Sequence, residues 1–166
     1  MMQLPSRSRA AALAAGLLLV AAQVPAQSSQ PPVAPAKGDV IPVFETLGVD
    51  GKPAKVDFPK GSKTVLLFFL SGCPTCHKMI PEWNRAYERR AKDLKVIGVI
   101  MDQEPPGFWG MTPIAFPVLR SPGREFLSGL RVNRAPLTLR VGAGGRVDDL
   151  ALGIVDPIRL GELFAP

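Results

Sequence analysis

The sequence has 166 residues, of which 46% are hydrophobic and 20% are charged. This length suits one domain plus a short leader, and the apolar content supplies a core, which argues against a chain that is disordered throughout. The formal net charge is +6, and no basic run with interleaved aromatic residues points to nucleic-acid binding.

The N-terminus has the features of a secretory signal peptide. Arg7 and Arg9 form a positive region, residues 10–22 are an unbroken small and apolar run, and a small-residue cleavage site follows. The run is shorter than the roughly 18 apolar residues of a membrane span, which favours cleavage over an uncleaved membrane anchor. We expect a periplasmic protein, with the signal peptide over 1–26 and a Pro/Ser-rich linker over 27–38.

The remaining residues, 39–166, are expected to form one folded domain that begins with a β-hairpin. Residues 40–47 and 54–58 are strand candidates on either side of the turn signal Asp50-Gly51.

A β–α–β unit follows the hairpin. Residues 65–70 and 95–101 are continuous apolar runs, typical of strands covered on both faces. Between them an apolar stripe at three- and four-residue steps predicts a helix, kinked at Pro81. The stripe consists of Cys76, Ile80, Trp83, Tyr87 and Ala91.

The last third of the chain is predicted to contain short helices and strands. Residues 103–117 are predicted to be a loop with at most a short helix, and residues 122–130 a short helix. Residues 137–141 and 147–152 are predicted as antiparallel strands joined by a glycine turn, and a proline opens a final helix over 157–164.

Both cysteines lie in one motif, Cys73-Pro74-Thr75-Cys76, where the first buried strand meets the helix. A helix N-terminus favours a thiolate, so Cys73 is the expected nucleophile and the more buried Cys76 the expected resolving thiol. Zinc is disfavoured because the chain has one histidine and no second such motif, and we expect no metal and no cofactor.

Two other readings stay open. Cys73 to His77 match the C-x-x-C-H motif of covalent haem attachment, with His77 and one of Met79, Met101 or Met111 as axial ligands. The strand–motif–helix context weighs against that electron carrier. The other alternative is a redox-inert binding or accessory module.

From residue 40 to 164 the chain resembles the thioredoxin superfamily, particularly the exported TlpA/ResA-like branch. The resemblance is carried by Asp50-Gly51-Lys52-Pro53, the C-P-T-C motif, Pro81, the segment Phe116-Pro117-Val118-Leu119, the loop Arg134-Ala135-Pro136 and the turn Gly144-Gly145. It implies a thioredoxin-like α/β fold, a central mixed β-sheet flanked by helices, with the hairpin as an N-terminal extension.

The resemblance also implies site residues and partners. Pro136 would form a cis peptide beside the motif, and Pro74, Thr75 and Ala135 would contact the substrate. The partners would be protein thiols or disulfides of the cell envelope and a membrane or periplasmic redox protein, and the chain would act as a monomer.

Three positions depart from the family pattern. Gly72 stands where thioredoxins carry Trp, Leu67 where they carry a buried acid, and Met79 where many TlpA/ResA-like proteins carry Glu. The missing acid is also a feature of MauD-like accessory proteins. A buried carboxylate can accept the proton of the resolving thiol, so the direction of electron flow stays open.

Overall fold

The computed structural model describes residues 34–165, and the predicted signal peptide lies outside the described residues. Five strands form a mixed sheet in the order β5-β4-β3-β6-β7. The central strand β3 pairs in parallel with β4 and antiparallel with β6. The edge strand β5 is parallel to β4, and the other edge strand, β7, is antiparallel to β6. The strands are β3 (Lys63–Phe69), β4 (Leu94–Ile100), β5 (Val118–Arg120), β6 (Leu137–Val141) and β7 (Val147–Leu152).

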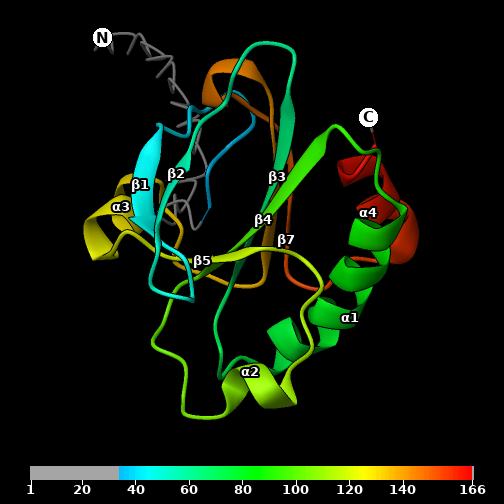
Figure 1. Ribbon diagram of the computed structural model, residues 1–166. Coiled ribbons are helices and arrows are strands. Elements are labelled where there is room, and N and C mark those ends of the chain that lie inside the picture. The colour runs from blue at the N-terminus through cyan, green and yellow to red at the C-terminus, as the bar shows by residue number, and fades with distance from the viewer. Residues whose placement is uncertain (1–33, 166) are drawn as a thin grey trace, which may run out of the picture. The chain divides into compact units, whose positions relative to one another are not determined.

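Helices cover both faces of this sheet, as the resemblance implied. Figure 1 shows α1 and α4 on one face, with α3 and a separate two-stranded hairpin on the other. The hairpin strands are β1 (Phe44–Leu47) and β2 (Pro53–Val56), and the helices are α1 (Pro74–Arg89), α2 (Phe108–Met111), α3 (Arg124–Gly129) and α4 (Pro157–Leu163). No helix within residues 34–165 is long and apolar enough to cross a membrane.

The continuous apolar run in β3 is explained by burial on both faces. Side chains alternate along a strand, so Val65, Leu67 and Phe69 pack in the core under α1 and α4. Leu66 and Phe68 belong to the second core, which includes the hairpin. Both faces of the strand are therefore closed to water, and the motif follows a strand that is packed on both sides.

Helix α1 buries Cys76, Ile80 and Trp83 of the predicted stripe and leaves Tyr87 half-buried, and it ends earlier than the sequence pattern indicated. Trp83 is fully buried, and its indole N–H donates to the Thr138 hydroxyl at 3.1 Å. The helix ends at Arg89, because Arg90 has extended backbone angles, so Ala91 lies beyond it. Pro81 lies inside the helix, where the sequence placed it.

The stretch after β4 is a loop with one short helix, as expected, and it is tied to an edge strand that the sequence did not reveal. Glu104 in the loop accepts two hydrogen bonds from Arg120 of β5, each 2.6 Å, and one from the Trp109 indole at 3.1 Å. In the short helix, Phe108 is buried in the core and Trp109 is half-buried against it.

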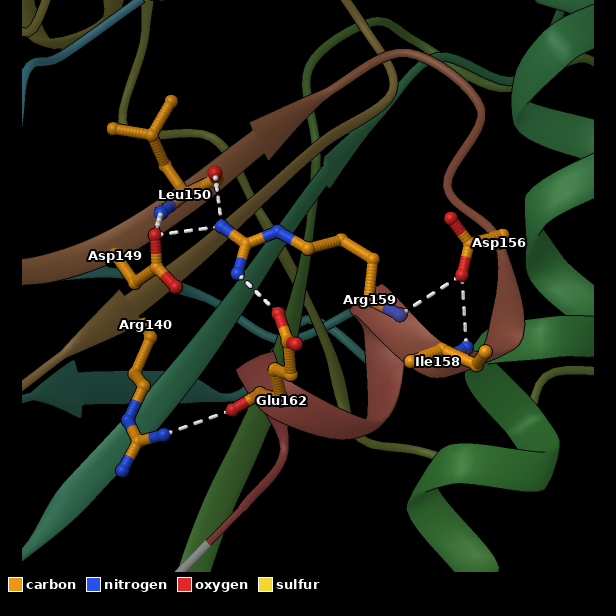
Figure 2. Close-up of polar contacts among 7 residues, drawn as sticks. All are labelled: Arg140, Asp149, Leu150, Asp156, Ile158, Arg159 and Glu162. Carbon is orange, nitrogen blue, oxygen red and sulfur yellow. Dashed lines mark hydrogen bonds and ion pairs between the residues drawn. The ribbon is translucent and has the colours of Figure 1, made fainter.

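A polar cluster fixes α4 against β7 (Figure 2). The Asp156 carboxylate caps the helix by accepting from the backbone N–H groups of Ile158 and Arg159, both at 2.9 Å. Arg159 then reaches Asp149 of β7 at 2.7 Å and Glu162 at 2.8 Å. The segment between β7 and α4 is thereby held beside the N-terminal half of α1.

Candidate active site

The cysteine motif lies where β3 ends and α1 begins, at the carboxyl edge of the parallel pair β3 and β4. Cys73 is the N-cap residue of α1, and Pro74 occupies the first turn, where its missing N–H costs no hydrogen bond. The cysteine side chain therefore faces the unsatisfied N–H groups and the positive dipole end of a 16-residue helix.

Cys73 has the surroundings of a stabilised thiolate. Its sulfur accepts from the backbone N–H of Cys76 at 3.2 Å and lies 3.0 Å from the Thr75 hydroxyl. Partial burial opposes ionisation, but the hydrogen bonds from Cys76 and Thr75 outweigh it, so the pKa of Cys73 lies below its ordinary value. This thiol is half-buried and can be reached from solvent.

Cys76 has the opposite character, although it lies only three residues further on. It is fully buried, and burial is the main cause that raises its pKa to about 12, followed by a hydrogen bond with Cys73. The negative charges of Cys73 and Asp102 raise it further. Both cysteines are free thiols in this structure.

The Ala135–Pro136 peptide is cis, as the resemblance implied, and it lies beside the motif. The carbonyl oxygen of Ala135 is 3.9 Å from the Cys73 sulfur, while Pro136 is buried and Ala135 is half-buried. Pro74 and Thr75 are exposed on the first turn of α1. All six residues assigned to the site by sequence are thus gathered around the end of β3, and their roles in exchange remain predictions.

Two of the residues that a haem would need, His77 and Met79, make other contacts in this structure. The Nε2 atom of His77 lies 2.6 Å from the Ser71 carbonyl oxygen, and the Met79 sulfur, in the core, accepts the Val155 N–H at 3.4 Å. Met111 is 75% exposed on α2. The ring nitrogen that would bind iron is already hydrogen-bonded, which weighs against the haem reading. Within residues 34–165, no three His, Cys, Asp or Glu side chains form a group that could hold a metal ion.

Asp102 is a site residue that the sequence reasoning missed. It follows β4 by two residues, and its carboxylate accepts hydrogen bonds from the Ser71 backbone N–H and hydroxyl. One signal was available, since an acid directly after a buried strand that pairs in parallel with the motif-bearing strand falls at the same sheet edge.

The fold and the cysteine pair together define a thiol–disulfide oxidoreductase of the thioredoxin superfamily. The profile of the Redoxin family matches residues 36–157, and the chain therefore belongs to that family.

Known proteins agree with this assignment. Sporulation thiol-disulfide oxidoreductase A of Bacillus subtilis (strain 168) is 24% identical over 127 residues, which cover 72% of this chain and 76% of that protein. The crystal structure of StoA from Bacillus subtilis matches with a TM-score of 0.62 at 22% identity, over 80% of this chain and 98% of that chain. A Chlorobium tepidum structure assigned as the thiol:disulfide interchange protein DsbE matches with a TM-score of 0.64 at 25% identity, over 78% of this chain and 94% of that chain.

Proposed function

We propose that this protein exchanges disulfides with protein thiols in the periplasm, with Cys73 as the nucleophile and Cys76 as the resolving thiol. The observation that carries the proposal is the contrast between the two sulfurs. Cys73 caps a helix and has a lowered pKa, whereas Cys76 is buried with a pKa of about 12. Export is supported by the leader-like residues 1–26 of the sequence.

The exchange proceeds by two displacements on sulfur. The Cys73 thiolate attacks a partner disulfide, a Cys73–partner S–S bond forms, and the first partner sulfur leaves as a thiolate. Cys76 then loses its proton and attacks the Cys73 sulfur, the second partner sulfur leaves as a thiolate, and the one proton from Cys76 is taken up by one of the two departing thiolates. The partner gains two electrons and the Cys73–Cys76 pair is oxidised. The reverse sequence oxidises a partner dithiol.

The expected partner at the surface beside Cys73 is an extended chain with an apolar side chain next to its cysteine. The Ala135 carbonyl faces Cys73, and the small Ala135 side chain leaves room for a backbone to approach. The Gly153 N–H donates to the Pro136 carbonyl at 2.8 Å, and the next residue, Ile154, is 59% exposed. A protein partner docked here would cover this isoleucine, and a single copy of the chain carries all these groups.

Trapping separates the roles of the two cysteines. Cys76→Ser should accumulate mixed disulfides with partners, because serine cannot displace the partner from Cys73, while Cys73→Ser should form none. The measurement is a non-reducing gel of separate periplasmic and cytoplasmic fractions from cells that express each variant. The double variant Cys73→Ser/Cys76→Ser is the matched control.

Reductant-sensitive adducts with Cys76→Ser alone, in the periplasmic fraction, are the expected result. Adducts with Cys73→Ser alone would reverse the roles. If neither variant forms adducts, the chain is a redox-inert module, and adducts confined to the cytoplasm would overturn the proposed location.

A further inference from the structure

His77 completes the C-x-x-C-H motif, but disulfide exchange between two thiols gives it no role. Its Nε2 atom lies 2.6 Å from the Ser71 carbonyl oxygen. A carbonyl oxygen only accepts hydrogen bonds, so Nε2 carries the proton and donates it. The bond joins the residue two positions before Cys73 to the residue directly after Cys76, so both cysteines lie inside the loop that it closes.

Ser71 is anchored from its other side by the strand next to β3. The residue is buried, at 6% exposure, and the Asp102 carboxylate after β4 accepts its backbone N–H at 2.9 Å and its hydroxyl at 2.8 Å. The Ser71 carbonyl is therefore a fixed acceptor, because its residue is tied to the sheet. A side chain that hydrogen-bonds this carbonyl is tied to the sheet with it.

The turn between β3 and α1 is held by hydrogen bonds rather than by packing at its centre. Gly72 lies between Ser71 and Cys73, and a Cβ atom at this position would meet no atom of residues 34–165 within 4 Å, apart from its chain neighbours. The Cys73 N–H donates to the Leu70 carbonyl at 3.3 Å, which is long for such a bond. The short contact from His77 is therefore the closer link between the turn and the helix.

The His77 residue is itself positioned by its ring and by its backbone. The ring is nearly perpendicular to that of Phe108, with centroids 6.0 Å apart, and Phe108 is buried in the core. The His77 backbone N–H donates to the Cys73 carbonyl at 3.1 Å. One residue thus binds the chain both before and after the expected nucleophile.

We propose that His77 is a positioning residue for disulfide exchange, which ties the turn before Cys73 to the first turn of α1 and so holds the two sulfurs in position to join. This inference rests on the proposed function. In this role His77 forms and breaks no bond to sulfur.

The expected effect is on closure of the Cys73–Cys76 disulfide. Two groups that are held in the right geometry react with a high effective concentration. While the pair is reduced, the hydrogen bond from His77 limits the motion of the turn, and once the disulfide has formed, the S–S bond itself limits that motion. Loss of the hydrogen bond therefore frees the dithiol more than the disulfide and makes closure less favourable.

The equilibrium with glutathione measures this effective concentration on purified protein. Oxidised glutathione takes two electrons and two protons from Cys73 and Cys76 and becomes two thiols, and mass spectrometry after acid quenching and alkylation gives the fraction of protein disulfide. His77→Phe keeps a ring against Phe108 and removes the donor. In a fixed glutathione buffer the ratio of disulfide to dithiol should fall about three- to tenfold, the range that one hydrogen bond contributes.

Three further variants make the comparison specific. His77→Gln places an amide N–H near the position of Nε2 and should recover most of the loss. Lys78→Ala changes the next residue, which is also exposed, and should match the parent. His77→Ala is a second variant without the donor, for use if the phenylalanine variant fails to fold.

A double-mutant cycle tests whether His77 acts through Ser71. Asp102→Ala releases Ser71 from the sheet, so its carbonyl is no longer a fixed acceptor. His77→Phe should then lower the ratio of disulfide to dithiol less in the Asp102→Ala background than in the parent. Equal effects in both backgrounds would overturn a role through Ser71.

An unchanged equilibrium in His77→Phe would overturn this inference alone, and an equal loss of stability in the dithiol and disulfide forms would then identify His77 as a structural residue. If the parent protein forms no Cys73–Cys76 disulfide in any glutathione buffer, the proposed function falls as well. The two failures are therefore distinguishable.

Discussion

Two identical side chains three residues apart differ in ionisation because the helix begins between them. Cys73 precedes the first turn, where free N–H groups and the Thr75 hydroxyl hydrogen-bond its sulfur. Cys76 lies inside the turn and points into the core, where no solvent stabilises a charge. The different roles proposed for the attacking and the resolving thiol therefore follow from their positions before and within the first helical turn.

Thr75 contributes to this difference through a single hydroxyl, 3.0 Å from the Cys73 sulfur. Thr75→Val keeps the shape of the side chain but removes the hydrogen bond, so the pKa of Cys73 should rise. The measurement is the pH dependence of Cys73 alkylation by iodoacetamide, with labelled peptides identified by mass spectrometry. In the parent protein Cys73 should be modified below neutral pH and Cys76 should not.

Thr75→Ser retains the hydroxyl and should alkylate with the parent's pH dependence. An unchanged profile in Thr75→Val would mean that the backbone N–H groups alone stabilise the thiolate.

At the level of elements, the site is assembled by segments that other interactions hold in place. Asp156 caps α4, and Arg159 joins the helix to β7 (Figure 2). The segment between these elements donates its Val155 N–H to Met79 on α1 and its Gly153 N–H to Pro136. Weakening the attachment of α4 would therefore affect the segment that packs beside the cysteines.

Asp156→Ala should lower the free energy of unfolding by about 1 kcal/mol, because two backbone N–H groups lose their acceptor. Urea denaturation followed by circular dichroism measures the change. Asp156→Ser, which keeps a capping oxygen, should recover most of the loss. Equal stability of the alanine variant and the parent would show that the Arg159 contacts alone hold the helix.

For the whole molecule, carboxylates in ion pairs make the free energy of unfolding dependent on pH in the acidic range. Hydrogen bonds from Arg120 are the main cause that lowers the pKa of Glu104 to about 2, and the pKa of Asp149 is lowered by its hydrogen bond from Arg159. A pKa lowered by folding means that the unfolded chain binds protons more readily. The stabilisation is present above the ordinary carboxyl pKa and is lost as the pH falls.

The free energy of unfolding should therefore decrease between about pH 5 and pH 2. Glu104→Gln should reduce stability at neutral pH by on the order of 1 kcal/mol and weaken the acid dependence. Guanidinium denaturation at a series of pH values checks both effects. Glu88→Gln, at an exposed position of α1, is the control, and a pH dependence identical to the parent in Glu104→Gln would contradict the assignment.

Local patterns in the sequence determined the β–α–β unit, the motif at its junction and most element positions. The apolar runs and the stripe through Cys76, Ile80 and Trp83 reflect burial that each segment needs wherever it packs. Resemblance supplied the cis peptide at Pro136. Boundaries and short elements were less accessible, since β5 has three residues and owes its place to pairing with β4.

Only the tertiary structure decided which groups surround the buried cysteine. The sequence showed no acid at Leu67 or Met79, yet the register of β3 on β4 brings Asp102 to Ser71 across 31 positions of the chain. A parallel pairing is joined by a long crossover, so no short-range pattern records which residues will face each other. The carboxylate that hydrogen-bonds the turn before Cys73 therefore reaches the site through strand pairing, whereas the thiol pair itself was visible in four consecutive residues.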